Sequence, residues 1–199
     1  MGIVSRSADT FYTYRFIKLL TTPWEDTEAY EYGIVDENGK VLRKARTLRS
    51  SEEKDAYTLF HRLVFNVKRL LEKLPLGRRR LASYAAALFL LREEVGMSDE
   101  QVEYALEKMG IDLEDDTDTL DESAAWFKLE DGSIAPGVYS LVSEVASPHT
   151  GETIGHPGDS VVIDEQTHSH GSVLGHPIYR VTHTSSKQIL YVCAEDIDR

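Results

Sequence analysis

A run of seven acidic residues between Asp112 and Glu122 divides this chain of 199 residues into two parts with different patterns. Before the run, apolar residues recur at the three-and-four spacing of helices, whereas after it they fall in short stretches of Val, Ile and Tyr. Closely spaced like charges repel one another and do not form a packed core. We therefore predict an α+β protein with a mostly helical domain at 1–111, an acidic linker at 112–123 and a small β domain at 124–199.

The first part contains the start and stop signals of helices. Ser50 and Glu53 form a capping-box pattern before a long amphipathic stretch. Ser98 and Gln101 repeat the pattern, and Gly110 is a suitable residue to end the helix that they begin. Within this part, Asn38-Gly39 predicts a tight turn, and with it a short β-hairpin. The predicted strands of this hairpin are 30–35 and 40–45, and the predicted helices are 9–22, 50–74, 78–95 and 98–109.

The second part has the pattern of a small all-β unit. Its apolar stretches are "GVYSLVSEV", "DSVVIDE", "HPIYRVTH" and "QILYVCA", separated by glycines and polar turns. Four or five short strands in a segment of this length are typical of an SH3-like or similar partly open barrel, which protects most of its own strand edges. We therefore predict a small C-terminal SH3-like β-barrel.

The two parts also differ in charge. Residues 1–95 contain 17 Lys and Arg and 13 Asp and Glu, whereas residues 96–199 contain 5 and 21, and the whole chain has a net charge of −12. A basic surface attracts polyanions or acidic proteins, while a strongly acidic one repels nucleic acid. The difference predicts separate partners for the two parts.

A basic cluster in the first part is the candidate binding site. Arg78, Arg79 and Arg80 follow Gly77 at the expected start of a helix, where the helix dipole disfavours cations, so helix stability does not explain them. Together with basic residues of the preceding helix they would form a patch for an acidic protein or for DNA; the alternative is a solvated surface near a loop. The full candidate patch is Lys68, Arg69, Lys73, Arg78, Arg79 and Arg80.

Histidines are concentrated in "HSHGSVLGHPIYRVTH" in the second part. His168 and His170 are two residues apart and would share one face of a strand, as in some zinc sites, with His176 and His183 as further candidate ligands. Histidines in solvated turns explain the same pattern without a metal. We expect no metal and no cofactor.

The remaining sequence signals describe a cytosolic protein without a recognisable catalytic motif. The longest apolar stretch, 81–91, is too short to span a membrane. The single cysteine, Cys193, cannot form an internal disulfide and lies in an apolar run typical of a strand core. Phosphate-binding loops, G-x-S-x-G, H-E-x-x-H and C-x-x-C motifs do not occur.

Three stretches carry a resemblance to a protein family. "TYRFIKLLTTPWEDTEAYEYGIVDENGKVL", "FHRLVFNVKRLLEKLP" and "ASYAAALFLLREE", within residues 10–95, resemble small proteins of marine tailed bacteriophages that are associated with the prohead core or the virion. The C-terminal strand pattern is similar to a β module of the same group. The resemblance implies a structural or assembly role, in the host cytoplasm during assembly or in the virion, with protein partners and no catalytic residue.

From these observations we expect a non-enzymatic assembly protein of a tailed phage. Two alternatives stay open: a nucleic-acid-binding regulatory or accessory protein that uses the basic patch, and a small metal-dependent enzyme that uses the C-terminal histidines. Bound metal would indicate the enzyme, and DNA binding that falls steeply with salt would indicate the regulator.

Overall fold

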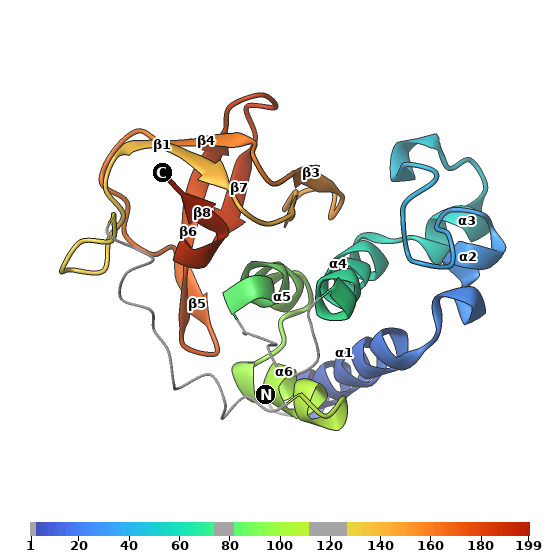
Figure 1. The fold of residues 1–199 in the computed structure, drawn as a ribbon. Coiled ribbons are helices and arrows are strands. Elements are labelled where there is room, and N and C mark those ends of the chain that lie inside the picture. The colour runs from blue at the N-terminus through green and yellow to red at the C-terminus, as the bar shows by residue number, and fades with distance from the viewer. Residues whose placement is uncertain (1–2, 74–81, 112–126) are drawn as a thin grey trace.

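The computed structural model describes residues 3–73, 82–111 and 127–199, and it has the predicted α+β organisation: helices in the N-terminal half and an antiparallel sheet in the C-terminal half (Figure 1). The helices are α1 (Ile3–Thr21), α2 (Glu28–Glu31), α3 (Ser51–Ala56), α4 (Leu59–Lys73), α5 (Ala82–Val95) and α6 (Asp99–Lys108), with 3₁₀ turns η1 (Trp24–Asp26) and η2 (Ala45–Thr47). The strands are β1 (Gly137–Leu141), β2 (Val145–Ala146), β3 (Thr153–Gly155), β4 (Ser160–Ile163), β5 (Gly171–Val173), β6 (His176–His183), β7 (Ile189–Val192) and β8 (Ile197–Asp198), with the 3₁₀ turn η4 (Ala194–Asp196) before β8.

Both predicted capping boxes are confirmed. The Ser50 hydroxyl accepts from the Glu53 N–H at the start of α3, and the Glu53 carboxylate accepts from the Ser50 N–H. Ser98 and Gln101 make the same reciprocal contacts at the start of α6. These contacts satisfy N–H groups that have no partner within the helix.

The long helix predicted over 50–74 is two helices, α3 and α4, that meet at a break. Tyr57 lies outside the helical region with ψ near 49°, and the Thr58 side chain bonds the ring of His61 in the first turn of α4. The apolar spacing continues across the break, so the sequence pattern alone does not show where α3 ends and α4 begins. Tyr57 and Phe60 are both buried on either side of it.

The predicted hairpin at 30–45 is wrong as a pair of strands, although its turn is present. Residues 30 and 31 belong to α2, whose first turn is capped by the Thr27 side chain. The turn is held by Asp36, whose carboxylate accepts from the N–H groups of Asn38 and Lys40. Among the described residues a single antiparallel bridge, Val35 with Val41, forms beside it, because no third strand there pairs with the segment.

The C-terminal strands form one antiparallel sheet in the order β5-β6-β4-β1-β8, with β7 paired to β6, and a separate pair β2-β3. The path of the sheet is open, and no closed barrel forms among the described residues. One side of the sheet packs into a core of its own. Its buried members include Phe127, Tyr139, Leu141, Tyr179, Val181 and Leu190.

Helix α5 joins the two halves through apolar contacts (Figure 1). Its residues from Tyr84 to Leu91 are all buried, and they share one apolar cluster with α1, α4 and α6. The same cluster includes Val173, Ile178 and Cys193 from the β half. The helical half and the β half therefore share a hydrophobic core.

The acidic linker at 112–123, and with it the predicted domain boundary, lies outside the described residues. In the part of the chain that the structure describes, no helix is long and apolar enough to cross a membrane.

Candidate functional site

Lys68, one of the six candidate polyanion-binding residues, is buried. Its ammonium group donates to the carbonyl of Thr22 and lies 4.3 Å from the centre of the Trp24 ring. Burial lowers its pKa. The side chain therefore serves to hold the segment after α1 against α4, and it is not open to a ligand.

The other described members of the predicted patch also have partners within the chain. Arg69 donates to the carbonyl of Gly39 at 3.0 Å and to the side chain of Asn66. Lys73 is exposed and pairs with Glu144 of the β half at 2.9 Å. The structure thus does not bring Lys68, Arg69 and Lys73 together as one open basic surface. Arg78, Arg79 and Arg80 lie outside the described residues, and their role stays a prediction.

The candidate metal-binding histidines do not converge. His168 and His170 are exposed, and the His170 ring lies 5.2 Å from the ring of Tyr191. His176 begins β6 and His183 ends it. Among the residues that the structure places, no group of three His, Cys, Asp or Glu side chains could hold a metal ion.

His183 does lie between a serine and an aspartate, which are the residue types of a catalytic triad. Its Nδ1 is 2.8 Å from the Ser186 hydroxyl, and its Nε2 is 3.4 Å from a carboxylate oxygen of Asp159. The residue is only 2% exposed, so a substrate cannot reach its ring. The contacts hold the turn between β6 and β7, where Lys187 adopts a φ of 59°.

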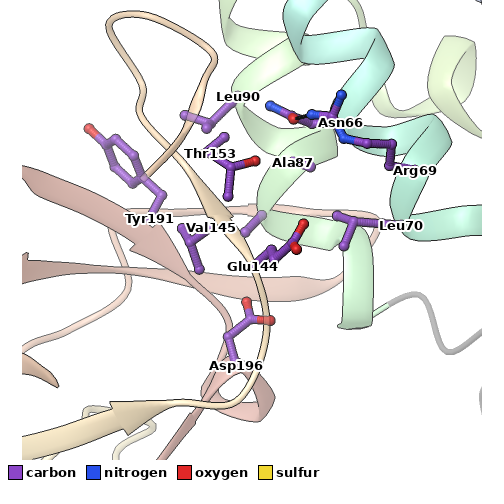
Figure 2. Close-up of a pocket in the computed structure, with 12 residues that line it drawn as sticks. Asn66, Arg69, Leu70, Ala87, Leu90, Glu144, Val145, Thr153, Tyr191 and Asp196 are labelled. Carbon is purple, nitrogen blue, oxygen red and sulfur yellow. Dashed lines mark hydrogen bonds between the residues drawn. The ribbon is translucent and has the colours of Figure 1, made fainter. Parts of the chain in front are cut away.

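A small cavity lies between the two halves (Figure 2). Its volume is about 20 Å³, which is room for about one water molecule. Helices α4 and α5 form one wall, and residues of β2, β3, β7 and η4 form the other. The lining residues are Asn66, Arg69, Leu70, Ala86, Ala87, Leu90, Glu144, Val145, Ala146, Thr153, Tyr191 and Asp196.

Asp196 is the buried acid at this cavity, and no sequence pattern predicts its burial. Its carboxylate accepts from the Ser143 hydroxyl at 2.6 Å and from the Cys193 N–H at 2.8 Å. Burial raises its pKa to about 6, against the lowering effect of these two hydrogen bonds. The group links η4 to the end of β1, and the cavity beside it is too small for a substrate.

The outward side of the sheet carries a row of uncharged side chains that crosses four strands. Val138 of β1 pairs with Val162 of β4, Val162 with Thr182 of β6, and Thr182 with Ile189 of β7. Val138 and Ile189, at the two ends, are 60% and 38% exposed, and the two inner residues are half-buried. We call these four residues the open sheet face.

Helix α5 packs on the same side of the sheet, next to the open sheet face. On β7, Tyr191 alternates with the core residues Leu190 and Val192, so it points outward like Ile189. Its ring lies 5.5 Å from Phe89 of α5. One part of this side is therefore covered by a helix, while no described helix covers the part with the four uncharged residues. The alternation of "QILYVCA" could have predicted an outward row, but the pairing of strands could not be read from sequence.

Comparison with known proteins gives no match to a protein family, to a curated protein or to a solved structure. The function is therefore inferred from the residues of this chain.

Proposed function

We propose that this chain is a non-enzymatic assembly protein that binds a protein partner through the open sheet face. The observation that supports the proposal is the uncharged row itself, with Val138 and Ile189 exposed at its ends. Apolar side chains that adjoin one another on a surface are a common feature of protein interaction sites. The side of the sheet that carries them already accepts helix α5 at Tyr191, which favours a further helix as the bound element.

The proposal assigns this role to the head or the virion of a tailed bacteriophage. Its support is the resemblance of residues 10–95 to small phage proteins that are associated with the prohead core. The chain would act in the host cytoplasm during assembly and then be retained in the virion or removed from it.

We also propose that the C-terminal half is a partly open SH3-like barrel. Three features support this: the path β8-β1-β4-β6-β7, the pairing of the first long strand with the last, and the 3₁₀ turn directly before β8. The strands β2 and β3 would then be a hairpin within the long connection from β1 to β4.

The geometry gives less support to the two alternatives. A nucleic-acid-binding role through the predicted patch would depend on Arg78, Arg79 and Arg80, since Lys68 is buried and Arg69 donates to a carbonyl of its own chain. A metal enzyme would need histidines that converge, and those in the described part of the chain do not.

Quantitative mass spectrometry of this chain in proheads and mature particles from the source phage tests the proposal. Enrichment in proheads, with loss or cleavage in mature particles, would support a core or scaffold role. Equal copy numbers in both would support a permanent virion component. Absence of the chain from both kinds of particle would overturn the assembly role.

A particle-incorporation assay tests whether the open sheet face is the binding surface. Val138→Lys combined with Ile189→Lys places two charges in the row, and we expect incorporation to fall by about tenfold or more, equivalent to at least about 1.4 kcal/mol. Leu42→Lys is the matched control, because Leu42 is an apolar residue with 57% exposure on a loop of the helical half. Equal incorporation of both variants would exclude this face.

A further inference from the structure

Helix α1 carries a second uncovered face with a different chemistry. Phe11 and Tyr14 are 55% and 64% exposed, and Lys18 is exposed one turn further along. Arg15 is half-buried at the edge of this face, and its guanidinium lies 5.5 Å from the centre of the Phe11 ring and 5.1 Å from that of the buried Phe60 ring of α4. The spacing of these four residues places them on one side of the helix, while Phe16 points into the core. We call Phe11, Tyr14, Arg15 and Lys18 the α1 face.

The α1 face is basic, whereas the β half that carries the open sheet face is acidic overall. No acidic residue occurs between positions 10 and 21, so the charged residues of this stretch of α1 are all cations. The β half, residues 127–199, contains 10 Asp and Glu and 4 Lys and Arg. Asp198 pairs with Ser140 and lies exposed on the outward side of the sheet, near Val138. Arg180 pairs with Tyr191, at the side of the row that faces α5.

One molecule cannot bring its own two faces together. Helix α1 packs on α4 and α6, whereas the sheet packs on α5. In Figure 1, α4 and α5 lie between α1 and the strands. The aromatic and basic face can therefore reach the uncharged row of the acidic β half only in another molecule.

We propose that the α1 face of one copy of this chain docks on the open sheet face of a second copy. The rings of Phe11 and Tyr14 would cover the row from Val138 to Ile189, and the cations of the α1 face would lie against the acidic surface of the β half. The inference rests on the assembly role proposed above, and it names a second copy of this chain as the partner.

A contact between two different faces has a structural consequence. Each pair of molecules leaves one α1 face and one open sheet face free, so further copies can add head to tail and form a ring or a filament. The alternative pairing, sheet face against sheet face, would bring together two β halves that both carry a net negative charge, and like charges oppose binding.

Sedimentation velocity of the purified full-length chain is the first test, from about 10 μM to about 1 mM, where micromolar to millimolar contacts are populated. We expect oligomers that grow with concentration and that weaken as salt is added, because salt screens the charged part of the contact. A chain that stays monomeric over the whole range overturns the inference.

Substitutions on the two faces form the second test. Phe11→Asp alters the α1 face and Val138→Lys alters the open sheet face, and we expect each alone to weaken self-association by about tenfold or more. Leu42→Lys is again the control and should associate like the unmodified chain. Thermal unfolding checks each fold, and Tyr14→Ser replaces Phe11→Asp if that variant is destabilised.

Mixing the two variants distinguishes this contact from a symmetric dimer. The Phe11→Asp chain keeps an intact sheet face and the Val138→Lys chain keeps an intact α1 face, so an equal mixture should form a one-to-one complex that grows no further. A mixture that stays monomeric, or a single variant that oligomerises like the unmodified chain, overturns the inference. A monomeric chain that is present in proheads would overturn only the contact between copies, whereas an oligomer that is absent from particles would overturn only the assembly role.

Discussion

At the scale of single residues, Asp196 makes folding depend on pH. Burial raises its pKa from 3.8 to about 6. Between these pH values the folded chain holds a proton that the unfolded chain has released, so the free energy of unfolding falls as the pH rises. Asp196→Asn removes the titration and keeps an acceptor for the Cys193 N–H. From about pH 4 to about pH 8 we expect the variant to gain up to about 3 kcal/mol relative to the unmodified chain, measured by urea unfolding. A constant difference between the two proteins would contradict this.

His61 produces a pH dependence of the opposite sign. Burial, with the nearby charges of Arg15 and Arg62, lowers its pKa from 6.5 to about 4. As the pH falls through this range the unfolded chain takes up a proton that the folded chain does not, so the free energy of unfolding falls with it. His61→Asn can keep a hydrogen bond to Thr58 but cannot be protonated, so its loss of stability on acidification should be smaller. Urea unfolding at about pH 7 and about pH 5 measures the difference, and parallel losses would contradict the assignment.

The role of a single residue was predictable from the sequence only where its partners are close to it along the chain. The roles of Ser50 and Ser98 were predictable, because a capping box involves residues three apart and needs no knowledge of the rest of the fold. The burial of Lys68 was not, since it depends on Thr22 and Trp24, which are more than forty positions away. Asp196 is a similar case, because its donor Ser143 comes from a different strand connection.

At the scale of elements, the turn after α2 depends on close contact between Gly39 and Trp24. Gly39 has a φ of 72°, and a Cβ there would overlap the Trp24 ring, which is held in place by a hydrogen bond to Glu72. Gly33 is the matched control, with a φ of 63° and nothing within 4 Å of such a Cβ. We expect Gly33→Ala to cost about 1–2 kcal/mol and Gly39→Ala to cost at least about 2 kcal/mol more, measured by urea unfolding. Equal costs would show that the contact with Trp24 adds nothing.

Elements were predictable where a local pattern decides them and not where their ends depend on contacts. Helix α6 follows from its apolar spacing and its capping box, and α5 follows from its alanine-rich apolar run. The break between α3 and α4 was not predictable, because Tyr57 and Thr58 interrupt the helix without interrupting the apolar spacing. The segment at 30–45 has a good hairpin turn, but a turn without a further strand to pair with leaves only one bridge.

At the scale of the whole molecule, the division into a helical and a β half was predictable and their shared core was not. The change of apolar period and the change of charge both occur along the chain, so sequence displays them directly. The open sheet face depends on which strands pair, and the packing of α5 on Tyr191 joins residues a hundred positions apart. Neither follows from periodicity.

Phe89 of α5 provides a test of this shared core. Its ring is buried between the halves, 5.5 Å from the Tyr191 ring and close against Gly171. We expect Phe89→Ala to lower the free energy of unfolding by about 3–5 kcal/mol, as for other buried aromatic side chains. Tyr104→Ala on α6 is the control, because its ring is half exposed, and it should cost about 1 kcal/mol or less.

The result that tests the shared core is whether Phe89→Ala lowers the stability of one half or of both halves. The fluorescence of Trp24, in a chain that carries Trp126→Phe, reports on the helical half, and hydrogen exchange of the β6 amides reports on the β half. Because Ile178 of β6 and Leu88 of α5 belong to one apolar cluster, Phe89→Ala should shift both signals to the same lower urea concentration. If the fluorescence transition moves while exchange in β6 is unchanged, the halves unfold separately and the contact through α5 does not couple them.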